Sequence, residues 1–119
     1  MLKLKDWISY NSFENDKSKW YALCKNPNSI PLILQYPHKI CWHALSYNEN
    51  AIDILTKNQD KIIWANLSYN LGAIDLISKN LDKIDWNKLS SNPSAINLLS
   101  QNIDKINWNM LSINPNAIE

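Results

Sequence analysis

The chain has 119 residues, 45% of them hydrophobic, and a formal net charge of +1 at pH 7. This hydrophobic fraction excludes a chain that is disordered throughout, and the near-neutral charge gives no sign of a strongly basic or acidic partner. Apolar runs last only a few residues, far short of the roughly 20 that span a bilayer, and the first residues lack the apolar stretch of a signal peptide. We therefore expect no membrane contact and a cytoplasmic location.

Tryptophan recurs with a fixed period, at positions 20, 42, 64, 86 and 108. The intervening residues repeat as well, with the pattern W-x-x-L-S-x-N-P-x-A-I-x-L-L-x-x-N-x-D-K-I-x. A fixed period in this range is typical of a solenoid, in which one small unit packs on copies of itself. The sequence predicts an all-α solenoid of 22-residue repeats.

Residues 1–19 do not follow the pattern, and we predict that they form a divergent N-terminal cap, because terminal repeats usually differ from inner ones. The repeat solenoid then spans residues 20–119, and its last repeat, which starts at Trp108, is incomplete. The first repeat also diverges, since it carries Pro31 where later repeats have Asp or Asn. A proline is tolerated in the first turn of a helix, so a helix that includes Pro31 should begin close to it.

Each repeat is predicted to be a pair of short helices. Trp86 and Leu89 have the i, i+3 spacing of a short helix, and Ala95, Ile96 and Leu99 have the apolar stripe of a longer one. Helices this short are marginal alone, so we expect burial of the Trp, Leu and Ile rows between repeats to stabilise them.

Asparagine and aspartate supply the turn signals, because the chain has a single glycine. Asn92-Pro93, like Asn26-Pro27, has the residue types of a helix N-cap followed by the first helical position. A second set of asparagines is predicted to end the longer helix by adopting the left-handed conformation. A set of aspartates, two positions later in each repeat, is predicted to cap the next short helix. These sets are Asn58, Asn80 and Asn102, and Asp60, Asp82 and Asp104.

The repeat resembles the tryptophan- and asparagine-rich short repeats found in many copies in giant DNA viruses of amoebae and algae. The residues that carry the resemblance include Trp86, Leu89-Ser90, Asn92-Pro93, Ala95-Ile96, Leu98-Leu99, Asn102, Asp104-Lys105-Ile106 and Trp108. The resemblance covers residues 20–119 and implies a helical repeat scaffold that mediates virus–host or virion-associated interactions, in the host cytoplasm or the virion.

Four metal-ligand residue types gather in the divergent part of the chain, at Cys24, His38, Cys41 and His43. Their spacing is not that of a zinc finger, and we predict no metal and no cofactor. We also predict no enzymatic activity, because the candidate nucleophiles Ser46, Ser68, Ser90 and Ser112 recur once per repeat, whereas an active site is normally unique.

Two binding functions remain. A lysine series, Lys39, Lys61, Lys83 and Lys105, could face nucleic acid, but neighbouring aspartates offset its charge and the chain has no arginine to read guanine. Nucleic-acid binding is therefore the alternative to protein–protein interaction. For a protein partner we predict the residues one and five positions after each Trp, which share one helix face: Tyr21, Lys25, His43, Tyr47 and Tyr69.

The C-terminal end is a further predicted contact. The last repeat stops before its longer helix is complete, which should leave apolar surface uncovered. We expect self-association through this end, or a longer array of which the chain is a part.

Overall fold

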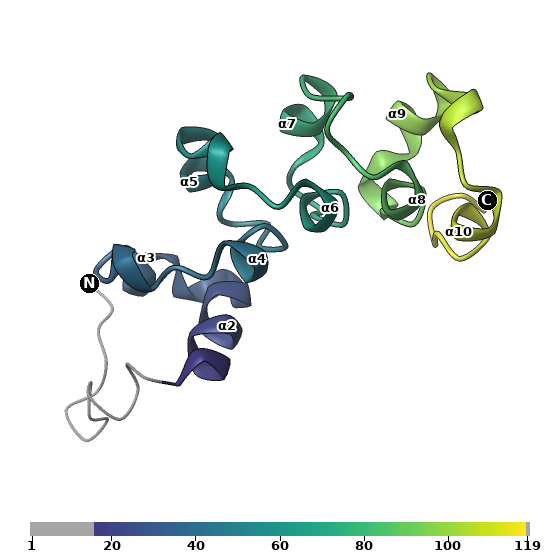
Figure 1. Ribbon diagram of the computed structural model, residues 1–119. Helices are drawn as coiled ribbons and strands as arrows, with labels where there is room; N and C mark the ends of the chain where they lie inside the picture. Colours follow the sequence, from purple (N-terminus) through teal and green to yellow (C-terminus); the bar gives the residue numbers. More distant parts are fainter. Residues whose placement is uncertain (1–15, 119) are drawn as a thin grey trace. The chain divides into compact units, whose positions relative to one another are not determined.

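The computed structural model describes residues 16–118, and every regular element in that part of the chain is helical (Figure 1). This confirms the predicted all-α class. The chain divides into two compact units, residues 1–62 and 63–119, which are described separately below. Within residues 16–118, no helix has the length and apolar character that crossing a bilayer requires.

The N-terminal unit alternates short α-helices with single 3₁₀ turns. In chain order its elements are α2 (Lys17–Lys25), η1 (Pro27–Ser29), α3 (Ile30–Ile33), η2 (Pro37–Lys39), α4 (Trp42–Leu45), α5 (Ile52–Lys57) and η3 (Gln59–Lys61). Pro31 lies in the first turn of α3, as expected. Most of the predicted cap, residues 1–19, lies outside the described residues, and its last residues begin α2, which continues into the first repeat.

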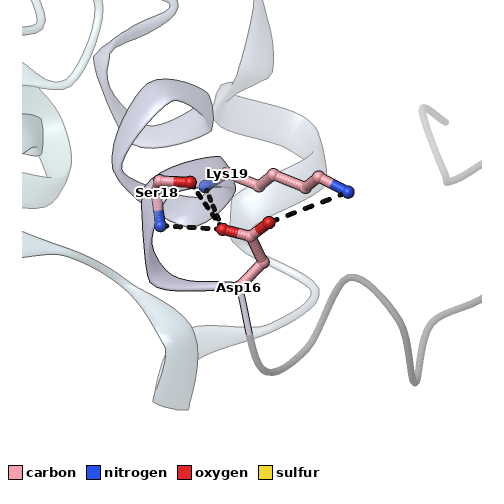
Figure 2. A network of polar contacts seen from close by, with 3 residues as sticks. All are labelled: Asp16, Ser18 and Lys19. Atoms are coloured by element: carbon pink, nitrogen blue, oxygen red, sulfur yellow. Dashed lines mark hydrogen bonds and ion pairs between the residues drawn. The ribbon is translucent and has the colours of Figure 1, made fainter.

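Helix α2 begins at Asp16, whose side chain caps it (Figure 2). The carboxylate accepts hydrogen bonds from the backbone N–H groups of Ser18 and Lys19, at 3.0 and 3.2 Å, and from the Ser18 hydroxyl. The Lys19 ammonium lies 3.8 Å from the second carboxylate oxygen of Asp16. These contacts favour the charged carboxylate, so the Ser18 hydroxyl above all, and then the Lys19 backbone N–H, lower the pKa of Asp16.

The C-terminal unit repeats a similar order. Its elements are α6 (Trp64–Leu67), α7 (Ile74–Ser78), α8 (Trp86–Leu89), η4 (Pro93–Ala95), α9 (Ile96–Ser100), η5 (Ile103–Lys105) and α10 (Trp108–Ser112). A helix that starts at Trp is thus followed by a second short helix, α6 by α7 and α8 by α9.

The turn between paired helices starts at an asparagine cap, as predicted. The Asn92 side-chain oxygen accepts from the backbone N–H of Ser94 at 2.9 Å, and Pro93 occupies the first position of η4. Asn26 caps η1 in the same way. The capped element is a 3₁₀ turn and not yet the α-helix, because the chain tightens for one turn before α9 or α3 begins.

The aspartate prediction is wrong. Asp60 and Asp104 lie inside η3 and η5 and do not cap the Trp helices. The residue immediately before Trp does so instead in two repeats, since Asp85 accepts from the Lys88 N–H at 3.2 Å and Asn107 accepts from the Met110 N–H at 3.1 Å. The side chain of the residue before Trp can fold over the first turn of the Trp helix. Asp60 and Asp104 cannot, because they lie inside the preceding 3₁₀ turn.

The left-handed asparagine prediction is also wrong, because no residue among positions 16–118 has a positive φ. Asn58 has φ −135° and ψ 50°, and Asn102 is nearly the same. Asn58 instead ends its helix with its side chain, whose amide donates to the Ile54 carbonyl at 2.8 Å. Asn80 and Asn102 make the equivalent bond to Leu76 and Leu98, so a side-chain donor satisfies the carbonyl that a glycine turn would have covered.

In each unit, apolar residues at three positions of the repeat are fully buried. They include Leu45, Ala51 and Leu55 in the N-terminal unit, and Leu67, Leu89, Ala73, Ala95, Ile77 and Leu99 in the C-terminal unit. Trp20 is 4% exposed, whereas Trp42, Trp64 and Trp86 are only partly buried and Trp108 is 62% exposed. The expected burial of the Trp row is therefore nearly complete at Trp20, partial at Trp42, Trp64 and Trp86, and absent at Trp108.

Candidate interaction surface

In the C-terminal unit, a buried asparagine in each of two repeats joins that repeat to the one before it. The Asn92 amide donates to the backbone oxygens of Ser68 and Asn70, both at 3.0 Å. Asn114 donates in the same way to Ser90 and Asn92, at 3.0 and 2.9 Å. Because the same side chains also cap the following turn, one asparagine per repeat fixes both the local turn and the contact with its predecessor.

In the N-terminal unit, Asn48 has the same role. Its amide donates to the backbone oxygens of Cys24 and Asn26, at 2.8 and 3.0 Å, and its side-chain oxygen accepts from the Asn50 N–H at 2.9 Å. Asn48 is 1% exposed. A buried amide with all its groups paired is a strong constraint on register, because leaving one unpaired is costly.

A buried hydroxyl joins the fifth residue of a repeat to the last residue of the same repeat. The Ser90 hydroxyl donates to the Trp86 carbonyl at 2.7 Å and accepts from the Asn107 N–H at 3.0 Å. Ser68 donates to Trp64 and accepts from the Asp85 N–H. The recurrent serines thus bond to backbone, which accounts for these two residues without a catalytic role.

Cys24 occupies the position of this serine in the first repeat. Its sulfur accepts from the Cys41 N–H at 3.3 Å, and the two residues are as far apart in the sequence as Ser90 and Asn107. Burial raises the pKa of the Cys24 thiol, which favours the neutral form. Residues 16–118 contain no group of three or more His, Cys, Asp or Glu side chains arranged to hold a metal ion, so the zinc candidates Cys24, His38, Cys41 and His43 do not form one.

The predicted partner-binding residues of the N-terminal unit lie on α2 and around α4. Tyr21 is 40% exposed on α2, and Lys25 is the last residue of that helix. The Lys25 ammonium lies 5.1 Å from the centre of the Tyr47 ring, within the range of a cation–π contact. His43 is exposed on α4, and Tyr47 is partly buried two residues after that helix.

Tyr69 lies in the C-terminal unit, where the sequence reasoning missed its neighbour. The Lys88 ammonium lies 5.8 Å from the Tyr69 ring centre. Lys88 stands two positions after Trp86, outside the pair of positions chosen from helix spacing, and its distance from Tyr69 along the chain is slightly less than one repeat. The sequence offered one signal for this contact, namely that Lys88 is a basic residue close to the positions chosen for the partner. Such a signal is weak on its own.

Two members of the lysine series cover tryptophan rings. The Lys61 ammonium lies 5.7 Å from the ring centre of Trp42, and the Lys83 ammonium lies 5.3 Å from the ring centre of Trp64. Each lysine belongs to the same repeat as the tryptophan that it covers, so the Lys and Trp positions of the pattern meet in space. Both distances are within the range of a cation–π contact.

No protein family, curated protein or solved structure matches the chain.

Proposed function

We propose that the protein is a non-enzymatic scaffold, an α-solenoid of 22-residue repeats, that binds a protein partner through Tyr21, Lys25, His43 and Tyr47 of the N-terminal unit and, separately, through Tyr69 of the C-terminal unit. The proposal is supported by a difference in burial between the recurring and the variable residues of the repeat. Side chains that recur, such as Asn92 and Ser90, are buried and bonded to backbone. The residues that vary between repeats remain accessible, so they can differ without disturbing the framework.

Tyrosine beside lysine and histidine suits recognition of a protein surface. Tyrosine supplies a large contact area with little conformational entropy to lose, and it is enriched among residues that dominate binding energy. Lys25 and Lys88 each lie over a tyrosine ring, which holds the ring in place before a partner arrives. Because the repeat resembles those of giant DNA viruses, we expect the partner among host cytoplasmic or virion proteins.

Nucleic-acid binding has less support. The contacts of Lys61 and Lys83 with tryptophan rings give these lysines a role within the chain. Electrostatic binding to phosphate needs several cations free to approach the backbone. A salt series on single-stranded and duplex nucleic acid tests the alternative, and steep salt-dependent retention near physiological salt would favour it over a protein partner.

The proposal is tested by comparing partner recovery with Tyr47→Ala/Tyr69→Ala and with a matched control, Asp53→Ala/Asp75→Ala. The control removes two exposed side chains from the first turns of α5 and α7. Circular dichroism first establishes that both variants keep the helical content of the original chain. We expect the tyrosine variant alone to lose a partner, and equal recovery of every partner by both variants would contradict the proposed surface.

A further inference from the structure

The C-terminal end of the described chain exposes the surface that inner repeats keep covered. Leu67 and Leu89, the fourth residues of their repeats, are fully buried, but the equivalent Leu111 is only partly buried. Trp86 is partly buried, and the equivalent Trp108 is 62% exposed. The same residue types are therefore more exposed at positions 108 and 111 than at the equivalent inner positions.

An apolar groove of about 220 Å³ opens on this end. Its lining comes from α9, η5 and α10 and is apolar except for Ser100; it includes Ile96, Leu99, Ile103, Ile106, Trp108 and Leu111. Ile103 is 60% exposed at its rim. Contiguous apolar surface of this kind is a typical mark of an interface.

Polar groups at the same end match the links between inner repeats. Asn92 donates to the carbonyls of Ser68 and Asn70, and Asn114 to those of Ser90 and Asn92. The carbonyls of Ser112 and Asn114 lie one repeat after those of Ser90 and Asn92. They are therefore the equivalent acceptors for an asparagine of one further repeat.

The Ser112 hydroxyl also differs from its counterparts. Ser68 and Ser90 donate to the tryptophan four positions earlier and accept a backbone N–H from a residue near the start of the next tryptophan helix. Ser112 is exposed and donates to the Asn109 carbonyl at 2.5 Å. The Ser112 hydroxyl thus donates to a carbonyl three positions earlier, whereas the hydroxyls of Ser68 and Ser90 donate to a carbonyl four positions earlier.

We propose that this end binds one further unit of the same 22-residue pattern. Its two adjacent leucines fill the groove beside Leu111 and Trp108, and its buried asparagine donates to the carbonyls of Ser112 and Asn114. The occupant follows from continuity, because the contact repeats the interface that residues 86–107 already make with residues 108–118. The inference is independent of the proposed tyrosine surface, which involves none of these residues.

The test extends the full chain in register. A copy of residues 98–118 is appended directly after Glu119, so that the copy of Asn114 falls one full repeat after Asn114 itself. The first control appends the same residues in scrambled order, and the second carries alanine in place of the copied asparagine. Hydrogen exchange is followed at the amides of residues 109–114, and thermal unfolding is followed by circular dichroism.

We expect the in-register extension to raise protection of these amides about tenfold or more, since covered backbone opens less often, and to raise the melting temperature. The scrambled extension should change neither, and the alanine control should give a smaller gain than the in-register extension. Trp108→Ala should lower the melting temperature more in the extended chain than in the original. Unchanged protection in the extended chain would overturn the proposal. So would concentration-dependent dimerisation of the original chain that Trp108→Ala abolishes, because a second copy would then be the occupant.

Discussion

Replacing Asn92 with alanine tests whether the buried asparagines hold the repeats together. Asn92 is 1% exposed, and its side chain makes three hydrogen bonds: to the carbonyls of Ser68 and Asn70, and from the N–H of Ser94. A typical intramolecular hydrogen bond contributes about 1 kcal/mol net, and more when its loss leaves a buried group unpaired. Three such losses predict a fall of about 3 kcal/mol in the free energy of unfolding.

Urea denaturation followed by circular dichroism measures this loss. With a slope of about 2 kcal/mol per molar, a loss of about 3 kcal/mol moves the midpoint by roughly 1.5 M. The matched control is Asn97→Ala, because Asn97 is exposed on α9, and surface substitutions usually change stability by less than about 0.5 kcal/mol. If Asn92→Ala unfolds at the same urea concentration as Asn97→Ala, the amide does not join the repeats and the reasoning fails.

Asn92→Asp separates hydrogen bonding from side-chain volume. The aspartate is nearly the same size, but it places an oxygen where the amide donated to two carbonyls, so we expect a larger loss of stability than for alanine at neutral pH. Burial among acceptors raises the pKa of such a carboxyl. The variant should therefore recover part of its stability relative to the original chain as the pH falls and the carboxyl becomes protonated.

Three further outcomes are expected. Trp20→Ala should cost about 3–5 kcal/mol because Trp20 is buried, whereas Trp108→Ala should cost about 1 kcal/mol or less in the original chain; equal midpoints in urea would refute the burial difference. At Cys24, serine should be tolerated because a hydroxyl can accept the Cys41 N–H, whereas alanine leaves that N–H unpaired and should cost about 1–3 kcal/mol; a thermal shift as large for serine as for alanine would contradict this. Since the pKa of Asp16 is lowered, its capping of α2 is complete above the ordinary Asp value of 3.8 and is lost as pH falls through the lower folded value; Asp16→Ala should remove this part of the acid-induced loss of helicity measured by circular dichroism.

The period and residue types of the sequence were enough to predict the helical class and part of the local structure. The i, i+3 spacing of Trp86 and Leu89 predicts α8, and Asn92-Pro93 predicts a capped turn, because both depend on residues a few positions apart. Of the candidate surface, Lys25 and Tyr47 were placed in one row, and they lie in contact. Their separation is one full repeat, so the period places them at equivalent positions of consecutive repeats.

The tertiary structure decided which recurring residues are buried and which atoms they contact. Trp and Leu recur equally often, yet Leu89 is fully buried while Trp86 lies at the margin. The asparagine of each repeat was predicted as a cap, but the Asn92 amide also reaches the carbonyls of Ser68 and Asn70 in the preceding repeat. The contact of Tyr69 with Lys88 follows neither a helix period nor the repeat length. A repeat period specifies which residues are equivalent, whereas the offset and angle between neighbouring repeats determine which side chains meet, and these depend on packing of the whole interface.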